Sequence, residues 1–503
     1  MKETKPSYGL LSILMIGAFV AILNNTLFNI ALPAIMKDLG ISASTVQWLT
    51  TGFMLVNGIV IPTTAFLIQK YTVRQLFLTA MGLFAIGTVI GGFAASFPVL
   101  LTARLVQALG AAVIMPLLMN VLITSFPPEK RGGAMGVFGL VIIFAPAIGP
   151  TLSGWLIEHY HWSVLFYVLL PIVLLVFIFA FFKLHDQKER ADIQIDTLSL
   201  LLSTIGFGGI LYGFSSAGNE GWTHPTVITS IVVGLVFLLF FIWRQFRIET
   251  PMLSFRIYRH PIYALSSTII ITIAISMFSV MLILPMYLQN IRGFTPFESG
   301  LLMLPGAIIM GLMSPITGKI FDRYGVKVLA ITGLTTVLIT TYCFTQLSSS
   351  TSYTTLVILY SLRMLGISMV MMPIMTTGLN SLPQKDYPHG TAMNSTLQQV
   401  SGAFGSSLMI SIMSNRAETY AKEMMNDALS KPSSAPVDLA VFKQQVLMDA
   451  TIKGMDDAFW VATGIALLAL ILALFIKDSK KRNKQKPITK PVQVVTEEVG
   501  QHS

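Results

Sequence analysis

The chain has 503 residues, of which 54% are hydrophobic and only 11% are charged, and its mean hydropathy is +0.72. Soluble domains carry about 25% charged residues, and a single soluble core stops growing at about 250–300 residues. The composition excludes a soluble enzyme and a disordered chain, and its net charge of +10 does not indicate nucleic acid because the basic residues fall between long apolar runs.

Long apolar runs predict fourteen membrane-spanning helices. Each run is close to the ~20 residues that a helix needs to cross a bilayer, and none shows the alternation of a barrel strand. The first run is too long for a signal peptide and is predicted to be an uncleaved span. The expected spans cover roughly residues 10–32, 45–68, 76–96, 99–121, 134–157, 163–182, 197–214, 226–243, 263–287, 299–317, 328–347, 353–377, 391–414 and 458–476.

The basic residues are distributed unequally between the two sets of loops. Of 33 Lys and Arg, 24 fall in the N-terminal segment, alternate loops and the tail, seven fall in the other loops, and Arg104 and Arg363 lie within spans. This asymmetry predicts that both termini are cytoplasmic. Residues 415–457 are then expected to form a long extracellular loop, with short amphipathic helices within it as an open alternative. The single cysteine, Cys343, excludes an intrachain disulfide.

An internal repeat is visible at similar offsets. Residues 130–136 resemble 388–394, residues 65–74 resemble 318–327, and Arg104 matches Arg363. Repeated bundles with a binding site between them are common in transporters. The expected organisation is a six-helix bundle over 1–182, an inserted helix pair with its linkers over 183–262, a second six-helix bundle over 263–476, and a basic cytoplasmic tail over 477–503.

Three motifs resemble those of the major facilitator superfamily. They are a loop motif running from Gly318 to Gly325, a fourth-span motif that begins at Arg104, and a fifth-span motif that ends in Gly149-Pro150-Thr151-Leu152-Ser153-Gly154. The chain is most similar to the fourteen-helix drug:proton antiporters, including QacA-like and lincomycin-resistance exporters. The resemblance implies an all-α membrane protein with the major facilitator fold, which is two six-helix bundles plus two inserted helices.

The same resemblance implies a function. We expect a multidrug efflux transporter of the bacterial plasma membrane that exports lipophilic small molecules in exchange for protons, acts as a monomer, and has no cofactor, metal or enzymatic activity. An exporter or facilitator of an endogenous metabolite, signalling nucleotide or lipid is the alternative. The residues independently exclude an ATP-driven pump, because the sequence contains no phosphate-binding loop of the Walker type. An ion gradient must therefore supply the energy for transport.

Polar residues within the spans are the candidates for a substrate cavity. A charged side chain in a span is costly and usually faces a cavity or a partner, although Arg104 could reach the outer headgroups and Arg363 could be structural. Asn24 occupies a position that is usually acidic in the family, and Gln69 replaces the Asp of the first loop motif. The cavity candidates are Asn24, Asn25, Arg104, Asn120, Arg363, Asn394 and Gln398.

Two further sets follow from the motifs. Gly149, Pro150 and Gly154 are expected to form a kinked surface against the other half, with simple tight packing as the alternative. By the resemblance, the gating loops contain Arg74, Gly318, Asp322, Arg323 and Gly325.

The acidic residues avoid the middle of every predicted span. Proton coupling needs a titratable group, so we expect either a carboxylate near a span end or another route. The candidates are Glu158, Asp196 and Glu298, each of which could equally be a solvated surface group. An interior with arginines and amides but no carboxylates suits neutral, weakly basic or anionic amphiphiles better than permanent cations.

Overall fold

The computed structural model describes residues 8–41, 43–184, 196–430 and 439–476, and every regular element in these ranges is helical. The longer elements are α1 (Tyr8–Leu39), α2 (Ala43–Val60), α3 (Thr64–Lys70), α4 (Val73–Gly92), α5 (Phe97–Ser125), α6 (Arg131–His159), α7 (Val164–Lys183), α8 (Thr197–Glu220), α9 (Pro225–Arg247), α10 (Pro261–Met286), α11 (Pro296–Tyr324), α12 (Val326–Cys343), α13 (Tyr353–Asn380), α14 (Tyr387–Ser430) and α15 (Leu439–Leu474).

The helices form fourteen segments of membrane-spanning length, because α2 and α3 are joined into one by the short 3-10 helix η1 (Ile61–Thr63). Thirteen of the segments in the described residues are also apolar enough to cross a bilayer. The remaining one, α14, carries Asn, Gln, Thr and Ser side chains along its length. The all-helical membrane architecture therefore agrees with the sequence, and the most polar helix is one that packs inside the bundle.

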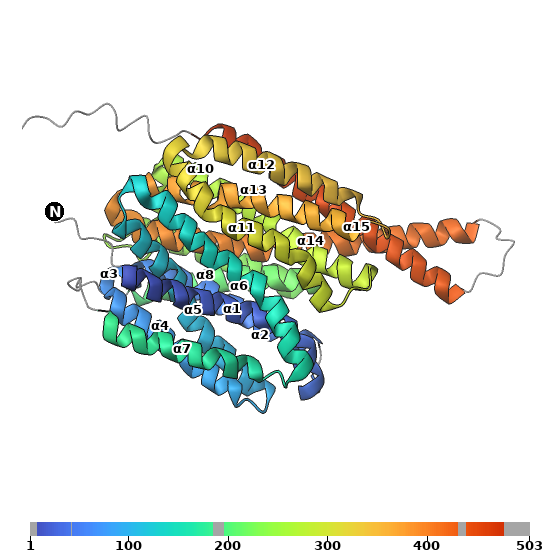
Figure 1. The fold of residues 1–503 in the computed structure, drawn as a ribbon, viewed down its shortest axis with the longest axis horizontal. Helices are drawn as coiled ribbons and strands as arrows, with labels where there is room; N and C mark the ends of the chain where they lie inside the picture. Colours follow the sequence, from blue (N-terminus) through green and yellow to red (C-terminus); the bar gives the residue numbers. More distant parts are fainter. Residues whose placement is uncertain (1–7, 42, 185–195, 431–438, 477–503) are drawn as a thin grey trace, which may run out of the picture.

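Two halves of the chain form two neighbouring bundles (Figure 1). Apart from α6 and α11, which pack most extensively on each other, helices α1 to α7 pack mainly on one another, and so do α10 to α15. The halves meet where α6 crosses α11 and where α14 lies against α2, α3 and α5. The inserted helices α8 and α9 pack on each other, and α8 also contacts α2 and α14.

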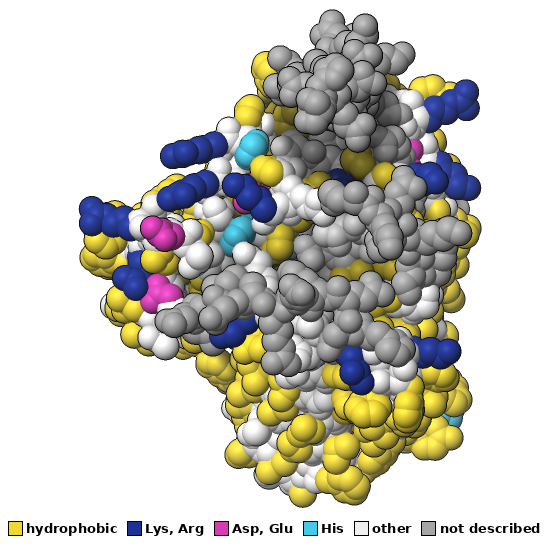
Figure 2. Space-filling view, turned by 90° about the vertical axis from the view of Figure 1, so that its left-hand side faces the viewer, with side chains coloured by type: hydrophobic (Ala, Val, Ile, Leu, Met, Phe, Trp, Pro, Cys, Tyr) yellow, Lys and Arg dark blue, Asp and Glu magenta, His cyan; other side chains and the backbone are white. Residues whose placement is uncertain are grey.

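Successive helices alternate in direction, so the bundle has two distinct ends. At the end we call the basic end, α3 stops at Lys70, α7 stops at Lys183 and α9 stops at Arg247. Figure 2 shows Lys and Arg side chains spread around this face, with few acidic ones among them. The basic ends of these described helices thus lie together at one end.

The opposite end carries a projection formed by the segment predicted to connect the last two spans. Within residues 415–457, for which short helices were left open, α14 continues to Ser430 and α15 begins at Leu439, so the two helices extend as a hairpin (Figure 1). The hairpin is closed at its base, where Arg416 pairs with Asp457 at 2.5 Å and Tyr420 donates to the same carboxylate at 3.0 Å. Residues with high helix propensity extend both helices beyond the predicted spans, and this ion pair holds the two helices together. We call this the hairpin end.

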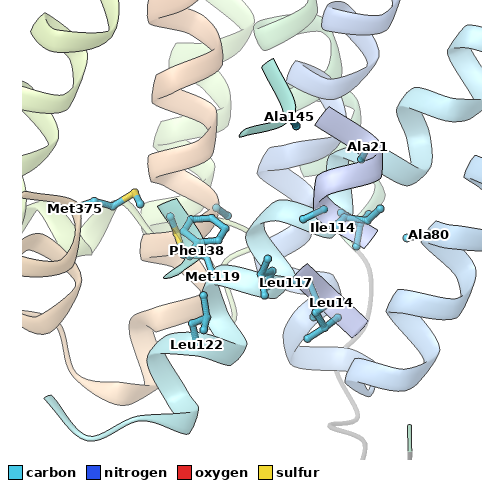
Figure 3. Close-up of a cluster of buried hydrophobic side chains, with 14 of the residues drawn as sticks. Leu14, Ala21, Ala80, Ile114, Leu117, Met119, Leu122, Phe138, Ala145 and Met375 are labelled. Carbon is cyan, nitrogen blue, oxygen red and sulfur yellow. The ribbon is translucent and has the colours of Figure 1, made fainter. Parts of the chain in front are cut away.

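Apolar side chains fill the interior and also cover the outside. Many large ones are exposed, for example Phe182 at 71% on α7 and Phe240 at 57% on α9, as expected for helices solvated by lipid. Inside, Met119 of α5, Phe138 of α6 and Met375 of α13 belong to one buried cluster, which joins the two halves (Figure 3).

Candidate functional site

The clearest polar joint between the halves lies at the basic end and is centred on Asp322. Its carboxylate, near the end of α11, accepts hydrogen bonds from the backbone N–H groups of Gly132 at 3.0 Å and Gly133 at 2.9 Å. These two groups are in the first turn of α6, which has no intrahelical partner for its N–H groups and carries a partial positive charge. The negative charge of one half therefore caps a helix of the other half.

Arg131 makes a second joint beside the first. Its guanidinium donates to Asn380 Oδ1 at 2.7 Å and to the Tyr387 hydroxyl at 2.9 Å, while its Nε donates to the Phe126 carbonyl at 2.9 Å. The side chain is buried and also lies over the Tyr387 ring, 4.9 Å from its centroid. Arg131 is in the N-terminal half and Asn380 and Tyr387 are in the C-terminal half, so these bonds must break if the halves separate here.

A third joint uses neutral groups. Nε2 of Gln69 lies 3.3 Å from Nε2 of His389, and the backbone N–H of Ser254 donates to Nδ1 of the same ring at 3.2 Å. Because Nδ1 accepts from a backbone N–H, it carries no proton, and the imidazole is therefore neutral. The repeat relates this joint to the first one. Gln69 stands where the second half has Asp322, and His389 stands where the first half has Arg131.

Of the other predicted gating residues, Gly318 contacts the opposite half, whereas Arg74, Gly325 and Arg323 do not take part in the joints described above. Arg74 donates to the Phe181 carbonyl at 3.1 Å, which is a contact within the N-terminal half. Gly318 packs on the Gly132 carbonyl so closely that an added Cβ would lie 2.3 Å from the oxygen. Gly325 joins α11 to α12 with a φ of 90°, a conformation that favours glycine. Arg323 is exposed, with its guanidinium over the Tyr324 ring.

Small residues make the crossing of α6 and α11 possible, but not those we expected. An added Cβ on Gly136 would lie 2.7 Å from the Ser314 carbonyl oxygen, and one on Gly139 would meet the Ser314 hydroxyl. Gly149 packs instead against Thr26 of α1, in its own half, and an added Cβ on Gly154 would meet nothing within 4 Å. The expectation that this motif faces the other half is therefore wrong for Gly149, because α6 turns toward α1 in its second half. The side chain of Pro150 lies outside the described residues.

Arg104 is fully buried in the N-terminal half and is surrounded by neutral groups. It donates to Gln107 Oε1 at 3.0 Å and to Asn25 Oδ1 at 3.4 Å, and its guanidinium lies 4.3 Å from the centroid of the Phe28 ring. Asn24 donates to the same Gln107 oxygen at 3.3 Å. The structure thus joins Arg104 to Asn25 directly and to Asn24 through Gln107. It does not place Arg104 at the headgroups.

Arg363 occupies the matching place in the C-terminal half. It donates to the Ser276 carbonyl at 2.7 Å, to the Ser276 hydroxyl at 3.2 Å, and to the Thr341 hydroxyl. Its side chain is fully buried. Among the residues that the structure describes, the buried charged side chains are Arg104, Arg131 and Arg363, with no buried Asp or Glu beside them.

The remaining cavity candidates are amides. Asn394 accepts from the Tyr263 hydroxyl at 3.2 Å, and its buried Nδ2 has no partner among the described groups. Asn120 is also buried, and its Oδ1 has no hydrogen-bond partner among the described groups. Gln398 is half-buried and donates to the Met375 sulfur at 3.7 Å. Such unsatisfied amide atoms favour a polar ligand or water at these positions.

The three candidate proton carriers lie at helix ends. Glu158 is exposed near the end of α6, and Glu298 caps α11 by accepting from the Thr295 N–H at 2.8 Å. Asp196 accepts two hydrogen bonds from Arg244 at 2.7 and 2.9 Å, which lower its pKa to about 2. All three are therefore held at the rim of the bundle, and two of them have structural partners.

Sequence reasoning missed several site residues. Arg131, Asn380, Tyr387 and His389 were not selected, although the repeat of 130–136 in 388–394 marks the segments that contain Arg131 and His389. Asp456 was also missed because it precedes the predicted last span. It lies in α15 at the base of the hairpin, where its Oδ1 is buried without a partner among the described residues.

Comparison with known proteins agrees with this geometry. A family model described as Major Facilitator Superfamily matches residues 14–406. The chain is 43% identical to the lincomycin resistance protein LmrB of Bacillus subtilis, over 93% of this chain and 95% of that protein. It is 44% identical to the uncharacterized MFS-type transporter YhcA of the same organism, over 96% of each chain. It is 26% identical to the multidrug resistance protein Stp of Mycobacterium tuberculosis, over 86% of this chain and 80% of that one.

A solved structure shares the fold at low sequence identity. The crystal structure of the human organic anion transporter MFSD10 (TETRAN) superposes with a TM-score of 0.65 and 12% identity, covering 93% of this chain and 100% of that chain. At this identity the likeness shows the arrangement of helices alone.

Proposed function

The chain belongs to the major facilitator superfamily of membrane transporters, and on this premise we propose that it exports lipophilic small molecules across the bacterial plasma membrane by proton antiport. The relatives named for lincomycin and multidrug resistance support efflux of antibiotics. The observation that carries the proposal is the joint at the basic end, where Asp322 and Arg131 link the two halves through bonds that can break and re-form. A single chain, acting as a monomer, would alternate between states open at either end.

The charge distribution supports an orientation. Loops rich in Lys and Arg stay on the cytoplasmic side, so we place the basic end and both chain termini in the cytoplasm. The helical hairpin then faces the exterior. In this orientation the structure corresponds to a state in which the cytoplasmic joints are formed.

The interior supports a substrate class. A buried guanidinium repels cations, and Arg104 and Arg363 have only neutral partners among the described residues. Unsatisfied amides at Asn120 and Asn394 can exchange hydrogen bonds with polar atoms of a ligand. We therefore propose neutral or anionic amphiphiles as substrates, with the seven cavity candidates lining or supporting their path.

Proton coupling is assigned to a carboxylate near the exterior. Asp196 is held ionised by Arg244 and Glu298 is engaged as a helix cap, whereas Glu158, the third candidate, has no such partner among the described residues. Asp456 joins it, because a buried carboxylate oxygen without a hydrogen bond gains from protonation. Neutralising the group that carries the proton should abolish the response to a pH gradient.

Inverted membrane vesicles test the proposal. Addition of a neutral lipophilic antibiotic to energised vesicles should partly collapse the pH gradient, as reported by an acridine dye, whereas a quaternary ammonium compound should not. Vesicles without the protein, and vesicles with Asp456→Asn or Glu158→Gln, are the controls. Collapse by the quaternary compound alone would refute the substrate class, and no collapse by any compound would refute drug:proton antiport.

A further inference from the structure

The inserted helices α8 and α9 are fixed to each other by small residues. Gly209 of α8 faces Gly234 of α9 so closely that an added Cβ on Gly209 would lie 2.8 Å from the Gly234 Cα. An added Cβ on Gly213 would lie 2.5 Å from Ile231. At the basic end, Arg244 of α9 pairs with Asp196 before α8, and Gln245 donates to Ser199 at 2.7 Å. Close backbone contact and these bonds make the two helices one body.

This body is tied to the C-terminal half by hydrogen bonds. Near the hairpin end, the Trp222 indole donates to the Ser411 hydroxyl of α14 at 2.9 Å, and the Ser407 hydroxyl donates to the Phe214 carbonyl. The rings of Phe214, Trp222 and Phe404 pack together, with centroids 5.1 to 6.1 Å apart. At the basic end, Gln245 accepts from the Leu253 N–H at 3.2 Å, in the segment that leads into α10.

The contact of α8 with the N-terminal half consists mainly of aromatic and apolar side chains. Tyr212 stacks on Trp48 of α2 with ring centroids 5.8 Å apart, and Leu211 enters a notch at Gly58, where an added Cβ would overlap it. Between α8 and α2, Ser215 donates to the Thr51 hydroxyl at 3.5 Å, the limit of such a bond. Stacked rings and an apolar notch allow sliding at less cost than aligned hydrogen bonds do.

The contact between α14 and the N-terminal half changes along the length of the bundle. In the half of the bundle near the basic end, α14 touches the N-terminal half directly, through Gln399 and the Met54 carbonyl at 3.3 Å and through His389 and Gln69. Toward the hairpin end, α8 contacts both α2 and α14. We propose that α8 and α9 move with the C-terminal half, and that α8 slides over α2 and keeps the seam between α2 and α14 covered while the halves rock. The inference rests on the proposed alternating access.

Two cysteine pairs, set two residues apart on α8, distinguish the two contacts. In a Cys343→Ala background, Thr51→Cys with Ser215→Cys links α8 to α2, and Ala217→Cys with Ser411→Cys links α8 to α14, where Ser411 Oγ lies 3.4 Å from the Ala217 carbonyl oxygen. A short thiol-specific crosslinker should reduce transport at least tenfold in the first pair, reversibly with reductant, and less than twofold in the second. Loss in the second pair, or tolerance in both, overturns the inference.

A readout without any drug separates this inference from the proposed function. The crosslinking rate of each pair is compared with and without Asp322→Asn, which weakens the joint at the basic end. The α8–α2 pair should react at least threefold more slowly in the variant, while the α8–α14 rate stays within 1.5-fold. Such rates with no antibiotic transport would refute drug export and leave the inference standing. Equal changes in both pairs, or none in either, would overturn it.

Discussion

Asp322 accepts a hydrogen bond from the backbone N–H of Gly133 at 2.9 Å, although the two residues are 189 positions apart and belong to different halves of the molecule. A carboxylate at a helix N-terminus is stabilised by the unpaired N–H groups and by the helix dipole. The bond needs no side chain from the partner helix. It can therefore form and break with little rearrangement other than the movement of the halves.

Replacing Asp322 with Asn removes the charge and one acceptor from this joint. We expect the substitution to destabilise the state closed at the basic end by about 1.4 kcal/mol. This corresponds to a tenfold shift toward the state open at that end. The buried Ser314, replaced by Cys in a Cys343→Ala background, reports the opening. Its labelling by a water-soluble maleimide added at the basic end should accelerate about tenfold with Asp322→Asn. The exposed neighbour change Arg323→Gln should leave the rate unaltered, and an equal effect of both would contradict the role of Asp322.

Arg131 should not tolerate replacement by Lys. One guanidinium binds Asn380, Tyr387 and the Phe126 carbonyl at once, and an ammonium cannot span these acceptors. Transport by Arg131→Lys should fall at least tenfold with unchanged expression. Tyr387→Phe, which removes one bond worth about 1 kcal/mol, should cost about fivefold or less. A larger loss in Tyr387→Phe than in Arg131→Lys would contradict this ranking.

An acidic residue at position 24 should change which substrates are accepted. Asn24 is buried beside the Gln107 that binds Arg104, and its Oδ1 is unpaired among the described groups. Asn24→Asp places a negative charge next to the guanidinium and lowers the barrier to cations. Transport of a quaternary ammonium dye should appear and that of anionic amphiphiles should decline. The neutral variant Asn24→Leu should gain no dye transport; a gain there would rule out charge as the cause.

Asp196 should matter for stability more than for coupling. Arg244 lowers its pKa from 3.8 to about 2, so the pair stabilises the protein above pH 3.8, and this contribution is lost as the pH falls toward 2. At pH 7, Asp196→Asn should lower the free energy of unfolding in detergent by about 1 kcal/mol, and the difference from wild type should shrink below pH 3.8. Proton-coupled transport should persist. An unchanged unfolding midpoint together with lost coupling would identify Asp196 as a proton carrier instead.

Two glycines of α6 should differ in their tolerance of alanine. An added methyl at Gly136 would press on the Ser314 carbonyl of α11, which cannot rotate away, whereas Gly154 has open space. Gly136→Ala should push the halves apart and reduce transport at least fivefold. Gly154→Ala should keep transport within twofold of wild type and stabilise the helix slightly. Measurement of both variants in the same vesicles decides the matter, and equal losses would contradict the assigned crossing.

Most of the fold followed from the sequence because lipid imposes simple rules. Apolar runs of sufficient length predicted the helices, and the repeat that relates Arg104 to Arg363 predicted two halves. The sequence left helices in 415–457 open but did not predict that the last two spans continue as a closed hairpin, because Arg416 and Asp457, which join them, are 41 residues apart in a polar stretch. Gly149 was assigned to the wrong partner because its motif predicts close packing but does not say which helix is packed. The joints at His389 and Arg131 depend on contacts between the halves that no local pattern reveals.

Transport by purified protein in proteoliposomes tests the central claim most directly. Vesicles with the protein and an imposed pH gradient should accumulate a radiolabelled neutral antibiotic at least tenfold above vesicles without the gradient, and a proton ionophore should abolish the difference. Accumulation that is the same with and without the gradient, while the protein remains folded and inserted, would contradict proton-driven export by the rocking of two halves.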